Sequence, residues 1–286
     1  MILLTAITHA GPRLAVKTAS GIIILETAKK EAGLPLTMEE IFIIPDALDR
    51  IHDFINQNPG LLAIPEEECR IGLPFRPRNL LCIGLNYKDD QAGPEVSLPS
   101  EPVIFAKLTG CVVGPNEPIV LPAAVREVGY EAELAVVIGR DCRRVSASDA
   151  LDYVAGYTCL NDLGARDLLR SDGQLVRAKS QDSFGPMGPY LVSREEIPDP
   201  QTLTIRSWVN AQLLQDSNTN QMIFGVRELI AYISDGITLE PSDVISTGTP
   251  PRVGSARKEQ VFLKSGDEVV VEVQGVGRLS NPVRRS

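Results

Sequence analysis

The residues Tyr130-Glu-Ala-Glu-Leu-Ala-Val-Val-Ile-Gly139 predict a buried β-strand that carries two carboxylates at one end. Side chains two apart on a strand point the same way, so Glu131 and Glu133 project from one face. The rest of the run is apolar on both faces, which is typical of a strand covered on both sides. Because an unpaired buried charge is costly, the two carboxylates need a partner, and a hard divalent cation would supply one. An E-x-E pair alone is more often a solvated strand end, so a metal site needs further ligands.

A third carboxylate follows in the segment Asn161-Asp-Leu-Gly-Ala-Arg-Asp167. Asp162 would complete a site made of oxygen ligands alone, which suits Mg²⁺ or Mn²⁺ better than zinc or copper. The competing interpretation is that Asn-Asp starts a turn or caps a helix. Arg166 lies four residues after Asp162, so a helix begun at Asp162 would bring both to one face. A structural ion pair of Arg166 with Asp167 or Asp149 is the alternative for that arginine.

The composition predicts a cytoplasmic enzyme. The chain has 286 residues, a net charge of −9 and a pI near 4.9, which argues against nucleic acid as a partner because phosphate binding needs a basic face. No apolar run reaches the length of a membrane span, and the N-terminus lacks the layout of a signal peptide. The five cysteines are scattered and form no C-x-x-C pair, which indicates reduced, mostly buried thiols.

Residues 1–70 predict a small N-terminal α+β domain. Residues 13–17 and 21–25 have the composition of two strands around a Ser-Gly turn. Thr37 with Glu40 three residues later forms a capping-box pattern, and apolar residues then recur at helical spacing.

Residues 71–286 predict a larger domain built mainly of β-strands. Short apolar runs alternate with Gly, Pro and Asp, and helical patterns are clear only at 147–153 and 224–233. The predicted fold class is therefore α+β and mainly β, with largely antiparallel strands of mixed topology.

Short segments in this second domain resemble, in order, the fumarylacetoacetate hydrolase family. The resemblance runs from Arg76 to Val283. It implies the family's β-roll, a rolled mixed sheet with a metal site in its open end, and a homodimer. The segments that carry it are Ile83-Gly-Leu-Asn-Tyr87, Glu101-Pro-Val-Ile-Phe-Ala-Lys107, Tyr130-Glu-Ala-Glu133, 152–157, 161–167, Ala178-Lys-Ser180, 184–189, 221–224, Thr247-Gly-Thr-Pro250, 266–267, 275–277 and 279–281.

The resemblance implies a role for each matching residue. Glu131, Glu133 and Asp162 become the ligands of Mg²⁺ or Mn²⁺, and Arg166 becomes the residue that grips the substrate carboxylate. Lys179 becomes an active-site lysine, and a nearby metal and arginine would lower its pKa, so that it could act as acid or base. The implied substrate-binding residues are Tyr87, Arg166, Lys179 and Thr249.

One departure from the family concerns the mobile lid. Hydrolytic members place a His and, three residues later, a Glu after Asn-Tyr, and this pair activates the attacking water. Here Asp90 and Gly93 fall on those positions, and the chain's two histidines both lie in residues 1–70. Asp90 or Glu95 could replace the base, provided that its pKa is raised. A milder departure is Ala211, where many relatives have Gly.

Three hypotheses follow for the function. The first is a metal-dependent lyase or isomerase that decarboxylates, tautomerises or isomerises a 2-oxo acid or β-diketone through a metal-stabilised enolate. The second is C–C hydrolysis of an acylpyruvate or a fumarylacetoacetate-like substrate, with Asp90 or Glu95 as base. The third is a pseudoenzyme with a binding role. The retained ligand set counts against the third and the missing His–Glu pair against the second, so the first is preferred.

Overall fold

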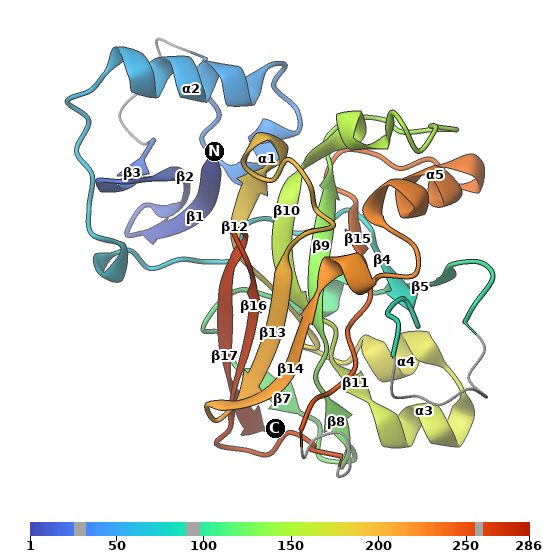
Figure 1. The fold of residues 1–286 in the computed structure, drawn as a ribbon. Coiled ribbons are helices and arrows are strands. Elements are labelled where there is room, and N and C mark those ends of the chain that lie inside the picture. Colours follow the sequence, from blue (N-terminus) through green and yellow to red (C-terminus); the bar gives the residue numbers. More distant parts are fainter. Residues whose placement is uncertain (26–32, 90–97, 255–259) are drawn as a thin grey trace.

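Two β-sheets pack face to face in the computed structural model, which describes residues 1–25, 33–89, 98–254 and 260–286 (Figure 1). Within these residues ten strands form a mixed sheet with the order β3-β2-β1-β12-β10-β9-β15-β4-β5, and β6 pairs with β12. Five strands form the second sheet, with the order β14-β13-β16-β17-β7. Most neighbouring strands are antiparallel, while the pairs β4–β15, β6–β12 and β7–β17 are parallel. The prediction of a mainly β, rolled mixed sheet is confirmed.

The elements have these bounds. The strands of the larger sheet are β1 (Ile2–Thr8), β2 (Gly11–Thr18), β3 (Gly21–Ile24), β4 (Leu80–Gly84), β5 (Val103–Lys107), β6 (Val112–Val113), β9 (Ala132–Ile138), β10 (Val154–Asn161), β12 (Gly185–Ser193) and β15 (Val244–Ser246). Those of the second sheet are β7 (Ile119–Leu121), β13 (Thr204–Val209), β14 (Gln212–Asn218), β16 (Glu268–Val273) and β17 (Gly277–Arg285), while β8 (Val128–Gly129) pairs with β11 (Gly164–Ala165). The α-helices are α1 (Met38–Ile41), α2 (Ala47–Gln57), α3 (Arg166–Asp172), α4 (Leu175–Lys179) and α5 (Val226–Gly236). The 3-10 helices are η1 (Glu66–Glu68), η2 (Thr109–Cys111), η3 (Ala150–Tyr153), η4 (Arg194–Glu196) and η5 (Thr219–Gln221).

Strand β9 lies between β10 and β15, and every one of its residues is buried. Leu134 and Val136 belong to the core between the two sheets, which also contains residues of β13, β16 and α5. Ala135 and Val137 belong to a second core on the other face of the larger sheet. The two cores explain why the sequence of this strand is apolar on both faces, as predicted.

The N-terminal strands extend the larger sheet. Strand β1 pairs with β12, with Ile2 opposite Val192, and β2 and β3 continue outward from it. Helix α2 covers these strands (Figure 1), and its residue Ile51 packs in the same core as Leu14 and Val16. A boundary between two domains near residue 70 stays a prediction.

Some local predictions need correction. The helix expected at 147–153 is only the 3-10 helix η3, because hydrogen bonds among Ser146, Ser148 and Asp149 form a turn there instead. Thr37 does precede α1, but its side chain makes no capping hydrogen bond. The helix expected at 224–233 is confirmed as α5. All five cysteines are free thiols, and no helix in the described ranges combines the length and apolarity needed to cross a membrane.

The turn between β13 and β14 explains the departure at Ala211. Asn210 and Ala211 form the two-residue loop, with φ of 50° and 65°. Both residues therefore have positive φ, a conformation that glycine adopts without the strain that a Cβ brings. We expect Ala211→Gly to stabilise the protein by about 1 kcal/mol, which corresponds to a rise in Tm of about 2–4 °C.

Thermal unfolding followed by circular dichroism would check this expectation. The matched control is Ala106→Gly in the middle of β5, where φ is ordinary and the added backbone freedom should lower Tm. An equal fall in Tm for both variants would contradict the assignment of strain to Ala211.

Candidate functional site

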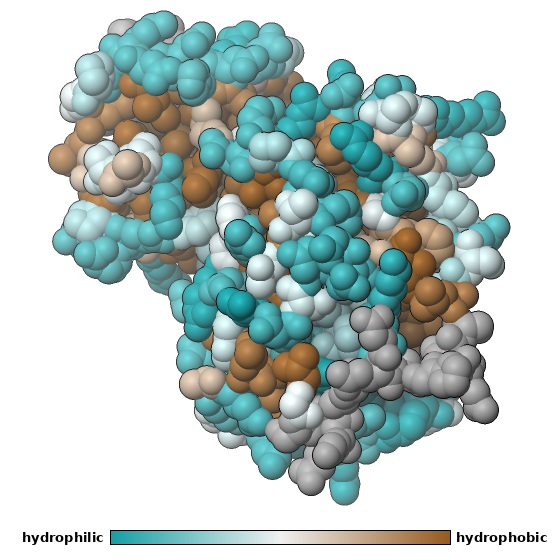
Figure 2. Space-filling model, in the orientation of Figure 1, coloured by the Kyte–Doolittle hydropathy of each residue, from teal (hydrophilic) through white to brown (hydrophobic). Residues whose placement is uncertain are grey.

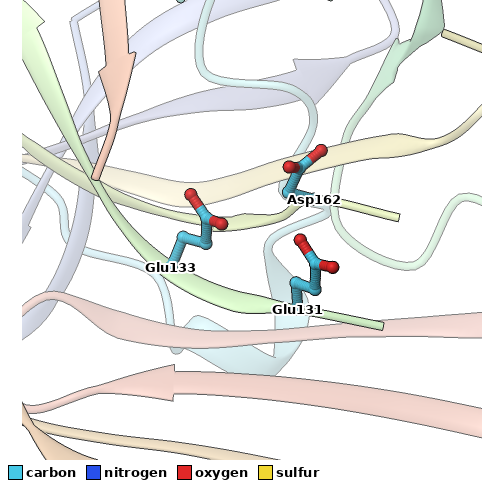
Figure 3. Close-up of side chains that lie close together, drawn as sticks. All are labelled: Glu131, Glu133 and Asp162. Atoms are coloured by element: carbon cyan, nitrogen blue, oxygen red, sulfur yellow. The ribbon is translucent and has the colours of Figure 1, made fainter. Parts of the chain in front are cut away.

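Three carboxylates converge at the end of β9 (Figure 3). Glu133 belongs to this strand, Glu131 immediately precedes it, and Asp162 follows the end of β10. The antiparallel register places Asn161 opposite Ala132, and the amide of Asp162 donates to the carbonyl oxygen of Glu131 at 2.9 Å. One oxygen of each carboxylate lies within 4.8 Å of the others, and all three residues are buried. The geometry thus brings together the three residues that the sequence singled out.

Glu133 is the carboxylate without a cationic partner in the described ranges. Its Oε2 accepts hydrogen bonds from the hydroxyl of Ser246 at 2.5 Å and from the amide of Gly248 at 2.9 Å. Burial raises the pKa of Glu133 well above its usual range, and repulsion from Asp162 and Glu131 adds to the rise. Glu133 is therefore the group at which the cluster most lacks positive charge.

Asp162 lies between two buried lysines. Its Oδ1 accepts from Nζ of Lys107 at 2.7 Å, and its Oδ2 accepts from Nζ of Lys179, also at 2.7 Å. Burial alone would raise the pKa of Asp162, but the two ammonium groups lower it below its usual value. Lys107 was not among the predicted site residues. The sequence gives one indication of its role, a single lysine at the end of the otherwise apolar strand 103–107.

Lys179 bridges two of the carboxylates. It donates to Oε2 of Glu131 at 2.5 Å as well as to Asp162, and Gly164 leaves room for it, since a Cβ there would lie 3.2 Å from Cδ and Cε of the lysine. The expected fall in its pKa assumed a neighbouring metal ion, and among the protein groups alone the balance is the opposite. Burial does disfavour the ammonium form, but the carboxylates of Asp162 and Glu131 outweigh burial and raise the pKa of Lys179.

Arg166 reaches the cluster by a route that differs from the predicted one. Helix α3 begins at Arg166 and not at Asp162, because Gly164 and Ala165 pair with β8 as a short strand. Its guanidinium donates to Oε1 of Glu131 and is about one-third exposed. The alternative ion pair of Arg166 with Asp167 or Asp149 does not occur among the described residues.

Thr249 holds the backbone beside the cluster. Its hydroxyl donates to the carbonyl oxygen of Ala132 at 2.9 Å and accepts from Nε2 of Gln215 at 2.8 Å. The buried Gln215 also accepts from the amide of Ala132 at 3.0 Å. Gln215, which sequence reasoning missed, therefore ties β14 and the loop after β15 to the start of β9.

A cavity of about 810 Å³ opens over the carboxylates. Its wall includes apolar side chains such as Phe105 and Leu169, and Figure 2 shows hydrophobic surface over β4 and β5. Tyr87 also lines the cavity, and its buried hydroxyl has no hydrogen-bond partner in the described part of the chain. A second cavity, of about 940 Å³, lies by β1, η1 and the 69–76 segment, far from any cluster of three carboxylates in the described residues.

The predicted replacements for the lid residues cannot be placed. Asp90 and Glu95 lie outside the described residues. His9 is exposed in the turn between β1 and β2, and His52 is exposed on α2. Neither histidine lines the cavity over the carboxylates.

Comparison with known proteins identifies the family. Residues 79–284 match the family described as fumarylacetoacetate (FAA) hydrolase C-terminal. A mitochondrial oxaloacetate tautomerase of Bos taurus is 40% identical over 96% of this chain and 88% of its own length. A mitochondrial oxaloacetate tautomerase of Xenopus laevis is 40% identical over 95% of this chain and 86% of its own length.

Solved structures agree with this match. The 5-carboxymethyl-2-hydroxymuconate delta-isomerase of Mycobacterium smegmatis has a TM-score of 0.79 and 33% identity, over 100% of this chain and 99% of its own. The maleylpyruvate hydrolase of Sphingobium sp. SYK-6, solved with manganese(II) and pyruvate, has a TM-score of 0.82 and 31% identity, over 100% of both chains.

These comparisons correct one expectation and confirm another. The expected cytoplasmic location is contradicted by the similar oxaloacetate tautomerases, which are mitochondrial. An enzyme, rather than a protein with a binding role alone, is confirmed by the named activities of relatives and structural neighbours. The chain belongs to the fumarylacetoacetate hydrolase family and is an enzyme of that superfamily.

Proposed function

We propose that this enzyme uses a divalent metal ion to interconvert the keto and enol forms of a 2-oxo acid such as oxaloacetate. The observation that carries the proposal is the buried cluster of Glu131, Glu133 and Asp162, with ligand atoms within 4.8 Å of one another. The named activity of the similar tautomerases supports the substrate class.

The donor set fits a hard cation. All three candidate ligands are carboxylates, and no histidine or cysteine joins their cluster in the described ranges, which suits Mg²⁺ or Mn²⁺. Glu133 contacts no lysine or arginine there, so the cluster can accept further positive charge. When bound, the ion supplies Lewis acidity that stabilises an enolate. The manganese in a structural neighbour supports this choice without separating Mn²⁺ from Mg²⁺.

The surrounding side chains supply the remaining functions. Lys179, which lines the cavity, is the candidate to carry the proton that moves between carbon and solvent during enolisation, since a cation held by the carboxylates would offset the negative charge that raises its pKa. Arg166 binds a carboxylate of the substrate, since a planar guanidinium matches a carboxylate with two hydrogen bonds. The hydroxyl of Tyr87, which has no hydrogen-bond partner among the described residues, supplies a donor for a substrate oxygen. Thr249, whose hydroxyl is already engaged, fixes the backbone beside the bound substrate.

Tautomerisation is preferred to C–C hydrolysis because it needs a proton carrier but no activated water. A His is the usual base for such a water, and both histidines of the chain lie away from the cavity. Hydrolysis of an acylpyruvate would need Asp90 or Glu95 as base. Incorporation of ¹⁸O from H₂¹⁸O into the carboxylate formed by C–C cleavage would identify hydrolysis and overturn the preference.

The metal site is tested by titration of the protein with Mn²⁺, followed by calorimetry, with and without oxalate as a mimic of the enolate. We expect oxalate to tighten Mn²⁺ binding in the native protein, and Glu133→Gln to weaken Mn²⁺ binding by at least about tenfold, because a charged ligand is lost. The rate of oxaloacetate tautomerisation, measured from the absorbance of the enol, should fall as well.

The matched control is Glu127→Gln. Glu127 lies four residues before Glu131 and pairs with Arg170 at 2.6 Å, away from the three carboxylates. Its replacement should leave Mn²⁺ affinity unchanged. Absence of Mn²⁺ binding to the native protein, or an equal loss in both variants, would refute the proposed metal site.

A further inference from the structure

Arg252 is held at the cavity wall by a fixed loop. The carbonyl oxygen of Pro250 accepts from Nε2 of Gln215 at 2.6 Å, and the amide of Val253 donates to the carbonyl oxygen of Leu214 at 2.9 Å. These two bonds pin the loop to β14 on both sides of Arg252. Its guanidinium lies over the ring of Tyr130, 5.2 Å from the ring centroid. The positive charge of Arg252 is therefore held in place beside Tyr130, the residue that precedes Glu131.

The guanidiniums of Arg252 and Arg166 approach the same point. A Cβ built on Gly129 would lie 3.2 Å from Nε of Arg166 and 3.5 Å from Nη2 of Arg252. Both arginines line the cavity over the carboxylates. Two guanidiniums that converge on one point can donate charge-assisted hydrogen bonds to the same anion. The missing side chain at position 129 leaves room for that approach.

The charge around the cluster favours a ligand with more than one negative charge. Lys107, Lys179 and Arg166 contact Glu131 and Asp162, so three cationic side chains already match the three carboxylates in number. A divalent cation would add two positive charges to this buried site. With Arg252 beside Arg166, a ligand with two carboxylates would offset more of this positive charge than a monocarboxylic 2-oxo acid would.

We propose that Arg252, together with Arg166, binds the second carboxylate of a dicarboxylic 2-oxo acid and thereby selects such acids over monocarboxylic ones. The inference rests on the proposed 2-oxo acid chemistry and adds to it a residue that determines specificity. Arg252 is expected to act on binding, since the second carboxylate, although attached to the carbon that exchanges its proton, itself gains and loses no bond.

The test compares oxaloacetate with its 4-methyl ester, which has the same carbon chain but lacks the second charge. In the Mn²⁺-loaded native enzyme, KM should be lower for oxaloacetate than for the ester. Arg252→Gln should raise KM for oxaloacetate about 10- to 100-fold, the loss expected for charge-assisted hydrogen bonds, and change KM for the ester little. The value of kcat should stay nearly constant, because uniform binding is lost. Arg252→Lys, which keeps the charge without the two-pronged geometry, should give an intermediate KM.

Two controls separate the possible failures. Arg278→Gln is the matched control, since Arg278 also lies over an aromatic ring, that of Trp208 at 4.9 Å, but on the second sheet, and its replacement should leave both KM values unchanged. Oxalate binding, measured by calorimetry, should survive in Arg252→Gln, because oxalate has no distal carboxylate. No oxalate binding in the native protein would refute the proposed chemistry itself. Intact oxalate binding with equal losses for oxaloacetate and its ester, or no loss for either, would overturn the role of Arg252 alone.

Discussion

Replacing Lys179 with methionine should lower kcat for oxaloacetate tautomerisation by about 10²- to 10⁴-fold, the contribution typical of a positioned acid or base. Methionine is apolar and of similar length, so it can fill the space of the lysine side chain but cannot carry a proton. Mn²⁺ affinity should not fall and should increase, because the ammonium that now neutralises Glu131 and Asp162 is removed. Stopped-flow measurement of enol absorbance and calorimetric titration with Mn²⁺ would give the two quantities on one variant.

A fall in activity together with a rise in Mn²⁺ affinity distinguishes a proton-carrying role of Lys179 from a structural one. The matched control is Lys17→Met, which removes another lysine paired with a carboxylate, that of Glu66, far from the cavity. That variant should retain full activity. Gly164→Ala offers a milder probe, because its Cβ would press on the Lys179 side chain without removing the amine. Full activity of Lys179→Met with native Mn²⁺ affinity would exclude Lys179 as the proton carrier.

Much of the site could be predicted from residue patterns because it lies on one strand. The alternation of side chains along β9 fixed the common direction of Glu131 and Glu133, and the apolar residues after them identified the strand as buried. Asp162 is different. It joins the cluster through the antiparallel register of β9 and β10, which is a long-range pairing, so its inclusion depended on resemblance to a family.

The residues that escaped prediction act through contacts between distant segments. Lys107, Ser246 and Gln215 come from β5, β15 and β14, and nothing in their local sequence shows which carboxylate or amide they meet. The helical spacing from Asp162 to Arg166 does not apply, because Gly164 and Ala165 form a short strand, so the assignment of Arg166 to the site depends on the family resemblance. The two carboxylates that raise the pKa of Lys179 also come from segments distant in the sequence.

Lys107→Met should have the largest effect on stability. The side chain of Lys107 is fully buried, and its ammonium donates to Oδ1 of Asp162 at 2.7 Å and to the carbonyl oxygen of Leu163 at 3.0 Å. Removal of one partner from a buried ion pair leaves the other charge uncompensated, at a cost of about 3–5 kcal/mol. For a chain of this size the expected fall in Tm is about 10 °C. Addition of Mn²⁺ should recover part of the loss, since a ligand that binds only the folded state stabilises it.

A double-mutant cycle separates the ion pair from simple loss of packing. If the cost comes from the stranded carboxylate, Lys107→Met combined with Asp162→Asn should be less destabilised than the sum of the single changes by about 1–3 kcal/mol. The exposed pair of Arg78 and Glu240, at 2.6 Å, provides the comparison, and Arg78→Met should cost no more than about 1 kcal/mol. Additive losses in the cycle would show that Lys107 contributes through its aliphatic chain alone. Coupling would mean that Asp162 is held ionised and in place by a lysine on another strand, so that β5 shapes the metal site without supplying a ligand to it.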